Sequence, residues 1–310
     1  MINMPSVDAL MDGELGIWLR LQDKKRKDAK QISLMLALLA APGGIVTVLV
    51  LKEFGIASVA NFFGGIVGAG LLFWALWNRQ QVVNTLKQRM NGALAKALDL
   101  EYSRRVEPGR ELEHARTFKL LPNYNRSEFE DRWSGQLQGT DFSLYEAVLK
   151  QKSSGRRNNS TRTVFRGLII RFTFARDFFG TTLIDRDRVR FTLFGENRKL
   201  GGRTLEPVKM VDPRFEDAFD IFSTNQAEAR YLVHPAYCER LIELEQSFEG
   251  KKLKALFHNG ELLVTVSSKN LFESATLSPE KDRERLGKTI EQFAALSNLI
   301  KTLNEHSRDY

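Results

Sequence analysis

Nearly fifty consecutive residues close to the N-terminus are uncharged and mostly apolar, with a pair of opposite charges in the middle. The run covers Gln31–Asn78 and is broken only by Lys52 and Glu53. A single helix over Ile32–Trp77 would be about 69 Å long at ~1.5 Å per residue, more than twice a ~30 Å hydrocarbon core. The pattern therefore predicts two helices rather than one.

Divided at the two charges, the run gives two segments that are each long enough to span a membrane once, Ile32–Leu51 and Ile56–Trp77. A lysine at mid-bilayer costs ~2.5–3.5 kcal/mol on insertion scales but little at the interface. We therefore expect Lys52–Gly55 to be the turn of a transmembrane hairpin covering residues 31–78. A buried hairpin of a soluble protein is the alternative, but neither segment has a polar face.

Glycines suggest how the two predicted spans pack. The sequence Pro42-Gly43-Gly44 is expected to interrupt the first span. In the second span, Gly64 and Gly68 form a small-xxx-small face, which lets helix backbones approach closely. We expect this face to pack on the first span or on another protomer.

Basic residues predict the orientation of the hairpin. Ten of them flank its two outer ends and one, Lys52, lies in the turn, which places both termini in the cytoplasm. The ten are Arg20, Lys24, Lys25, Arg26, Lys27, Lys30, Arg79, Lys87, Arg89 and Lys96. Lys24, Lys25, Arg26, Lys27 and Lys30 are also candidates for contact with anionic lipid, although a topology determinant without further function is the simpler interpretation.

The flanking segments read as helical. Residues 1–30 form an amphipathic and basic N-terminal segment, and residues 79–112 are expected to form a helical stalk. Apolar residues recur in the stalk at steps of three and four, the pattern of an amphipathic helix: Val82, Leu86, Met90, Ala93, Ala97 and Leu100.

The sequence pattern over residues 113–310 predicts a cytoplasmic α+β domain with mainly antiparallel strands. Gly135–Leu149 reads as two strands that turn at Gly139, and Thr163–Phe174 alternates as a half-buried strand. Between them, the polar stretch Gln151–Arg162 is expected to be a loop at a hairpin tip. Further short strands are expected at Thr181–Ile184, Val189–Phe194, Leu205–Val211 and Phe219–Phe222.

The C-terminal third combines helices with one hairpin. Pro235 is expected to open a helix that stops at Gly250, and Ser278-Pro279 to open a long C-terminal helix. Between them, Asn259-Gly260 is a strong signal for a β-hairpin. The predicted fold class is thus a membrane α-helical hairpin joined to an α+β domain.

Composition and charge add three constraints. The chain has 310 residues, and its formal net charge of +8 suits a protein beside an anionic membrane surface. Its one cysteine, Cys238, excludes an internal disulfide and is compatible with a reducing compartment. Positive charge gathers in the polar stretch at Arg156, Arg157 and Arg162, which are candidates for contact with anionic lipid or an acidic partner. No stacking aromatics interleave these residues, so nucleic acid is not an expected partner.

Candidate chemistry is sparse. His234 and Cys238 lie four residues apart, but no third metal ligand or orienting partner is evident, so a buried structural cysteine is the preferred interpretation. Gly287-Lys288-Thr289 resembles the end of a phosphate-binding loop, but it falls within a predicted helix. The acidic residues Asp212, Glu216, Asp217 and Asp220 are explained equally well as a solvated face. The sequence therefore predicts no catalytic residue, no cofactor and no metal site.

Two stretches resemble a known family. They are "TVFRGLIIRFTFARDFFGTTLI" at Thr163–Ile184 and "FDIFSTNQAEARYLVHPAYCERLIELEQSF" at Phe219–Phe248, followed by the hairpin at Leu253–Val266. They are similar to an uncharacterised bacterial membrane-protein family catalogued as domain of unknown function 3137, and the resemblance includes the two N-terminal spans. It implies a multi-pass protein of the bacterial inner membrane, often encoded near LemA-type membrane proteins, with no established activity. Asn225 departs from the family pattern, where an aspartate is expected.

These observations favour a membrane-anchored binding, scaffold or regulatory protein whose partners are the lipid bilayer and either a membrane protein or a second copy of the chain. The alternative is a hydrolase-like enzyme at the membrane surface, with a site assembled from residues distant in sequence. A deep pocket lined by titratable groups would favour the enzyme, and a flat or grooved apolar patch would favour the binding protein. The sequence thus favours a binding protein over an enzyme.

Overall fold

The structure, a computed structural model, describes residues 4–155, 158–175, 177–186, 197–210, 213–269, 272 and 275–306. The chain divides into two compact units. The hairpin unit holds residues 6–94 and 273–287, and the sheet unit holds residues 1–5, 95–272 and 288–310.

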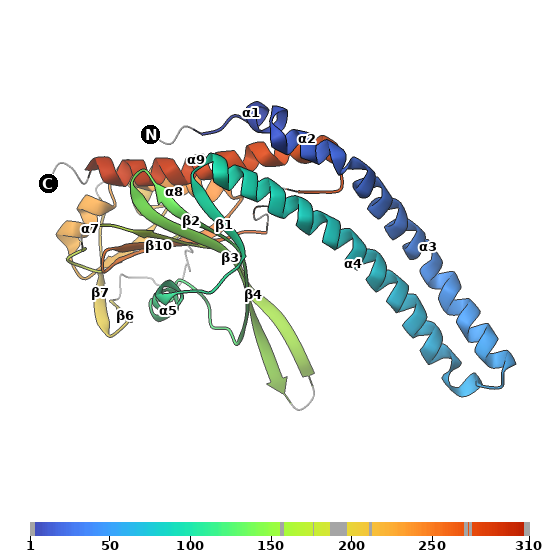
Figure 1. Ribbon diagram of the computed structural model, residues 1–310. Coiled ribbons are helices and arrows are strands. Elements are labelled where there is room, and N and C mark those ends of the chain that lie inside the picture. The colour runs from blue at the N-terminus through green and yellow to red at the C-terminus, as the bar shows by residue number, and fades with distance from the viewer. Residues whose placement is uncertain are drawn as a thin grey trace. The chain divides into compact units, whose positions relative to one another are not determined.

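Two long helices dominate the hairpin unit (Figure 1). Short helices α1 (Val7–Asp12) and α2 (Glu14–Leu21) precede α3 (Asp23–Glu53), and α4 (Ala57–Ala97) returns after a turn. The turn contains Gly55 with φ +77°, a left-handed conformation that glycine adopts without strain. Both long helices are long and apolar enough to cross a membrane. The prediction of two apolar helices near the N-terminus is thereby confirmed.

Two expectations about these helices are wrong. Helix α3 runs without interruption through Pro42, because one proline removes a single backbone hydrogen bond without forcing the helix to end. The helical stalk was expected over residues 79–112, but the helix ends at Ala97. Asp99 takes φ +56°, which is not helical, and the chain continues as a strand. That strand, β1 (Leu100–Arg105), begins with the buried Leu100.

The described residues of the sheet unit form one ten-stranded sheet with the order β1-β2-β3-β4-β10-β9-β5-β8-β7-β6, and each neighbouring pair is antiparallel. The remaining strands are β2 (Arg126–Leu137), β3 (Thr140–Gly155), β4 (Asn158–Thr173), β5 (Thr182–Asp185), β6 (Arg198–Leu200), β7 (Arg203–Pro207), β8 (Asp220–Ser223), β9 (Lys251–His258) and β10 (Glu261–Ser267). The predicted antiparallel sheet is confirmed.

Three strands, β2, β3 and β4, are longer than the sequence pattern indicates. The polar stretch expected to be a loop continues the ladder, since Gln151 pairs with Arg162 and Gly155 with Asn158. Backbone hydrogen bonds alone can extend such a two-stranded ribbon, whatever the polarity of its side chains. Strand β2 starts nine residues before the expected Gly135, and a register shift between Glu130 and Trp133 conceals its alternation. The strand expected at Val189–Phe194 lies outside the described residues.

Both faces of the sheet are buried, which explains the continuous apolar runs of its central strands. Helices α8 (Pro235–Ser247) and α9 (Asp282–His306) lie over one face, where Phe293 of α9 packs on Trp133 with ring centroids 4.7 Å apart. On the other face, α5 (Arg110–Thr117) and the segment after it contribute Ala115, Phe118 and Leu121 to an apolar cluster with the sheet. Short helices α6 (Pro213–Glu216) and α7 (Gln226–Leu232) complete this unit.

The C-terminal predictions agree closely with the structure. Strands β9 and β10 form the hairpin at Asn259-Gly260, both with positive φ as a type I′ turn requires. Pro235 opens α8, whose end is followed by Gly250. The long C-terminal helix begins at Asp282, after a single 3-10 turn at Pro279–Lys281 rather than directly at Pro279.

Candidate functional site

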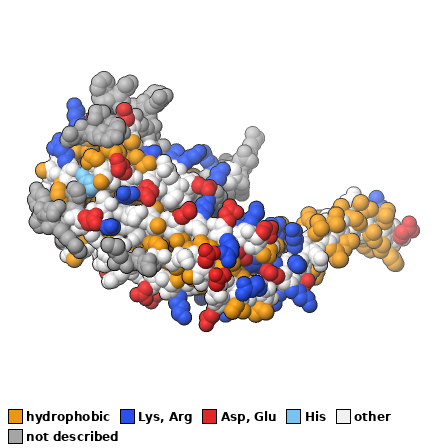
Figure 2. Space-filling view, turned by 90° about the horizontal axis from the view of Figure 1, so that it is seen from above, with side chains coloured by type: hydrophobic (Ala, Val, Ile, Leu, Met, Phe, Trp, Pro, Cys, Tyr) orange, Lys and Arg blue, Asp and Glu red, His pale blue; other side chains and the backbone are white. Residues whose placement is uncertain are grey.

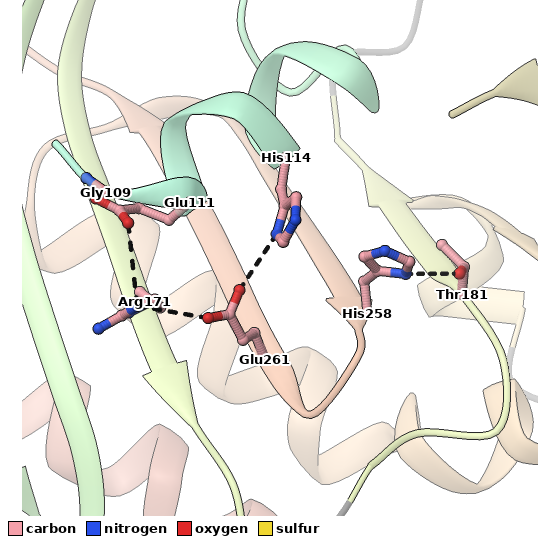
Figure 3. Close-up of polar contacts among 7 residues, drawn as sticks. All are labelled: Gly109, Glu111, His114, Arg171, Thr181, His258 and Glu261. Atoms are coloured by element: carbon pink, nitrogen blue, oxygen red, sulfur yellow. Dashed lines mark hydrogen bonds and ion pairs between the residues drawn. The ribbon is translucent and has the colours of Figure 1, made fainter. Parts of the chain in front are cut away.

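Six polar residues from five segments of the sheet unit meet on the α5 face of the sheet. We call this group the histidine cluster (Figure 3): Glu111, His114, Arg171, Thr181, His258 and Glu261. The sequence places these residues as far apart as Glu111 and Glu261, so only the fold brings them together.

Sheet register and helix period explain the positions of the side chains. His258 and Glu261 are directly opposite each other across the β9–β10 turn. On the neighbouring strand β4, Arg171 is opposite Leu263, so it shares the face of Glu261. Helix α5 contributes Glu111 and His114, three residues apart and hence on one side of the helix.

Glu261 bridges His114 and Arg171. Its Oε2 lies 3.3 Å from His114 Nδ1, and its Oε1 accepts a hydrogen bond from Arg171 at 3.5 Å. Arg171 is also 4.0 Å from the carboxylate of Glu111, which accepts the backbone N–H of Gly109 at 2.7 Å. These contacts tie the start of α5 to the centre of the sheet.

His258 is held in an apolar setting. Its side chain is only 8% exposed, and its ring lies 4.8 Å from that of Phe118 and 5.5 Å, edge to face, from that of His114. Burial, then the nearby charges of Arg203 and His114, lower the pKa of His258 from 6.5 to about 4. The ring is therefore neutral at pH 7, and its Nδ1 shares a 2.9 Å hydrogen bond with Thr181 Oγ1.

The solvent exposure of each side chain limits the chemistry that the histidine cluster could perform. Thr181 is hydrogen-bonded to a neutral histidine, as an activated nucleophile would be, but it is fully buried and no substrate can reach it without local opening. His114 and Glu261 remain partly accessible, with side chains 28% and 17% exposed. Within the described ranges, no group of three or more His, Cys, Asp or Glu residues is placed to hold a metal ion. The contacts are those of a polar clamp between α5 and the sheet.

The predicted lipid-contact residues of the hairpin unit differ in their exposure. Lys24, Lys25, Lys27 and Lys30 are exposed on α3. Arg26 departs from the expected exposed cluster: its side chain is 0% exposed, and its Nη1 donates to Asp282 Oδ2 at 2.7 Å. A helical period explains the difference, because position 26 faces inward while its neighbours face solvent.

Gly64 and Gly68 of α4 lie directly against α3. A Cβ at Gly64 would be 2.6 Å from the carbonyl oxygen of Gly44, and one at Gly68 would be 2.9 Å from that of Ala40. In contrast, nothing lies within 4 Å of a Cβ added at Gly65.

Of the remaining predicted site residues, the structure describes one, which lies on strand β4. Arg162 is exposed on β4, and Arg156 and Arg157 lie outside the described residues.

His234 and Cys238, four residues apart in the sequence, both have structural roles. His234 caps α8 by accepting the N–H of Tyr237, and Cys238 is fully buried. This geometry agrees with the structural interpretation of Cys238.

The histidine cluster was not predicted, because its histidines appear scattered in the sequence. One signal was available: the Asn259-Gly260 turn fixes the register of its hairpin and thereby places His258 opposite Glu261. The partners on α5 and β4 depend on long-range packing, for which the sequence pattern holds no equivalent signal.

Comparisons with known proteins support part of the resemblance stated above. Residues 163–305 match the family model described as "Protein of unknown function (DUF3137)". Both quoted stretches fall inside this range, and the two long apolar helices fall outside it. No curated protein matches the chain.

One solved structure is similar at a low level, the mycobacterial trehalose monomycolate transport factor A, TtfA. The alignment has 11% sequence identity and covers 69% of this chain and 96% of that one, with a TM-score of 0.34. At this level of similarity, neither fold nor function carries over.

Proposed function

We propose that this chain is a binding protein anchored in the bacterial inner membrane by the α3–α4 hairpin, with both termini and the sheet unit in the cytoplasm. On this proposal it acts as a scaffold or regulatory partner and catalyses no reaction. The family match over residues 163–305 is to a family of unknown function, and the support for this proposal comes from the chain's own surface.

One observation supports both the anchor and the binding role. Among the described residues, every large hydrophobic side chain that is exposed lies between Ile17 and Trp77, with the sole exception of Phe179. Figure 2 shows hydrophobic side chains covering the end of the hairpin. Soluble proteins rarely leave so large an apolar surface in water, and a bilayer is the solvent that suits it.

The orientation follows from charge. Basic residues concentrate at the outer ends of α3 and α4, whereas the turn holds Lys52 alone, the distribution of a hairpin whose ends are cytoplasmic. Lys24, Lys25, Lys27 and Lys30 are then placed beside anionic headgroups, each worth ~1 kcal/mol of attraction.

Reporter fusions test the anchor. Green fluorescent protein joined to either terminus should fluoresce, and alkaline phosphatase inserted after Phe54 should be active, because only the turn lies outside the cytoplasm. Alkaline carbonate should fail to extract the protein from membranes. Release by carbonate, or digestion of the sheet unit by protease added to intact spheroplasts, would contradict the proposal.

The binding role is supported by the way in which Phe179 is presented. Its side chain is 93% exposed, while the backbone N–H groups of Phe179 and Gly180 donate to the two carboxylate oxygens of Glu228 at 2.8 and 2.6 Å. The preceding Phe178 is buried against Phe257, with ring centroids 5.1 Å apart. A fixed turn that holds one aromatic ring in solvent is a preorganised anchor for a partner's pocket.

We propose two partners that fit such an anchor, a second copy of this chain and a LemA-type membrane protein of the kind that the sequence resemblance suggests. Exposed Arg162, with Arg156 and Arg157, would add a basic contact with anionic lipid or with an acidic surface on the partner. Replacing these three arginines by serine should reduce the anionic lipid that copurifies with the protein, whereas Lys150→Ser, whose lysine pairs with Glu128, should not. No specific observation favours the enzymatic alternative, given that Thr181 of the histidine cluster is fully buried.

A further inference from the structure

Strand β1 forms one end of the sheet and has an open edge. Within the described part of the chain, it pairs with β2 alone. An edge strand directs the N–H and C=O groups of every second residue away from the sheet, where another strand can bind them. Four of its six residues are exposed, which leaves the side chains along this edge open to solvent: Glu101, Ser103, Arg104 and Arg105.

The side chains of β1 alternate regularly between the two faces of the sheet. The strand pairs with β2 in one continuous register, and all six of its residues are described without a positive φ among them. Glu101, Ser103 and Arg105 therefore share one face, and Tyr102 and Arg104 share the other. Tyr102 is only partly buried, so its ring is accessible beside the edge.

Three charged side chains on this edge are available to a partner. In the part of the chain that the structure describes, no residue forms an ion pair with Glu101, Arg104 or Arg105. Arg105 is opposite Glu130 in the register with β2, but these two residues form no ion pair either. An edge with exposed charges of both signs is matched by a strand that carries them in the opposite order.

A second copy of β1, running antiparallel to the first, supplies this order. A two-fold axis at Ser103 places Glu101 of each copy opposite Arg105 of the other, on the same face. On the other face, Tyr102 of each copy comes opposite Arg104, and a guanidinium and a tyrosine ring attract each other. Each of the four cross-strand contacts beside the axis is thus favourable.

The neighbouring registers lack this match. Residues that lie directly opposite each other must point to the same face, so the register changes only when the axis moves by a whole residue. With the axis at Arg104, two arginines are directly opposite each other. With the axis at Tyr102, Glu101 is opposite Ser103, and Arg104 is opposite the apolar Leu100. The charges therefore select the register centred on Ser103.

We propose that β1 pairs with β1 of a second copy of this chain, antiparallel and centred on Ser103, to form a two-fold symmetric dimer. The inference rests on the proposed function in taking a second copy as the partner, but it uses a surface separate from Phe179, which precedes β5 in the other half of the strand order. An isologous contact of this kind closes on itself, because both open edges are covered once they pair.

Cysteine crosslinking of the full-length protein in isolated membranes tests the pairing. In Ser103→Cys, the two thiols would lie opposite each other with Cβ atoms ~4.5–5.5 Å apart, close enough for copper phenanthroline to oxidise them to a disulfide. The native Cys238 is buried and does not compete. Ser160→Cys is the matched control, because Ser160 is an exposed serine in an antiparallel pair of strands away from β1. We expect a crosslinked dimer from Ser103→Cys and none from Ser160→Cys.

Charge reversal in the Ser103→Cys background tests the self-complementarity. Glu101→Arg places arginines opposite each other in both halves of the dimer, and Arg105→Glu places glutamates opposite each other. At low expression, where the dimer is the minor species, each reversal should reduce the initial rate of crosslinking about tenfold. The double variant Glu101→Arg/Arg105→Glu restores opposite charges in both halves and should recover most of the rate. Thermal unfolding in detergent should be unchanged, since both side chains are exposed.

Several results would overturn the pairing. They are the absence of a Ser103→Cys dimer, equal crosslinking of Ser160→Cys, and a double variant that crosslinks no faster than the single reversals. A Ser103→Cys crosslink to a different protein would overturn the choice of a second copy. Self-association that is lost in Phe179→Ser but unaffected by the charge reversals would overturn the β1 pairing and leave the proposed function standing. Release of the protein by carbonate would contradict the proposed anchor and leave the crosslinking result standing.

Discussion

Arg26 and Asp282, separated by 256 positions in the sequence, form an ion pair of 2.7 Å inside the hairpin unit. The side chains are 0% and 3% exposed, so solvent screens neither charge. Burial raises the pKa of Asp282, and the adjacent guanidinium of Arg26 opposes that shift. The pair joins the basic start of α3 to the first residue of α9, which belongs to the same unit.

Removing either partner should be costly, because the other would remain charged and buried. Arg26→Met and Asp282→Leu should each lower the free energy of unfolding by ~3–5 kcal/mol, whereas the double variant should recover most of that loss. Thermal unfolding in detergent, arranged as a double-mutant cycle, measures the coupling. As a control, Arg283→Met breaks an exposed pair with Asp8 and should cost less than ~1 kcal/mol. Additive losses in the double variant would refute the coupling.

His258 should make stability depend on pH. Its folded pKa of about 4 lies below the ordinary 6.5, so the unfolded chain takes up a proton first as the pH falls. The contribution is complete above pH 6.5 and is lost between pH 6.5 and 4, with a size of roughly 3 kcal/mol. His258→Gln, which does not titrate, should flatten the difference in unfolding midpoint between pH 7 and pH 5. An equally steep pH dependence in this variant would mean that another group is responsible.

Gly64 and Gly65 are adjacent in α4 and form a matched test of helix packing. Gly64→Ala would press its Cβ against the backbone of α3 and should destabilise the hairpin by ~1–3 kcal/mol, whereas Gly65→Ala has open space and should be neutral or slightly stabilising. Thermal unfolding in micelles compares the two. Equal effects would mean that α3 and α4 do not pack through this face.

Phe179 should matter for association and not for folding. Phe179→Ser removes a side chain that is 93% exposed, so the free energy of unfolding should stay within ~0.5 kcal/mol of wild type. Loss of an anchoring aromatic should weaken a complex by ~2 kcal/mol or more. Native mass spectrometry of the solubilised protein measures self-association, and titration with a purified LemA-type protein measures the other complex. Glu228→Gln is a useful companion, because it keeps the ring and weakens the hydrogen bonds that fix the turn. Unchanged affinities in Phe179→Ser would remove the proposed anchor.

Turn residues and hydropathy were enough to predict the elements that depend on neighbouring residues in the sequence. A type I′ turn requires two positive φ angles, which Asn259 and Gly260 adopt readily. The structure has the β-hairpin at this position. The two apolar helices follow from hydropathy alone. In contrast, α4 was expected to continue beyond Ala97 because a single left-handed residue, Asp99, leaves almost no trace in a pattern of apolar positions. The length of strand β2 was underestimated for the same reason, since Asp131 at φ +57° lies where the register shifts.

The polar sites required the folded chain. The basic cluster at residues 24–30 looks uniform in sequence, yet the partner of Arg26 is a distant aspartate that no spacing rule connects to it. Likewise, the histidine cluster combines His114 of α5 with His258 and Glu261, which come more than a hundred residues later. Sequence patterns give the face on which each residue lies, and packing decides which faces meet.

The burial of Cys238 has a practical consequence. It is the one thiol in the chain, and its side chain is 0% exposed. Maleimide reagents require an accessible thiolate, so the folded wild-type protein should be almost inert to them. A cysteine introduced at any exposed position can therefore be labelled selectively without first removing the native one, which makes the wild-type sequence a ready background for spin labels and fluorophores.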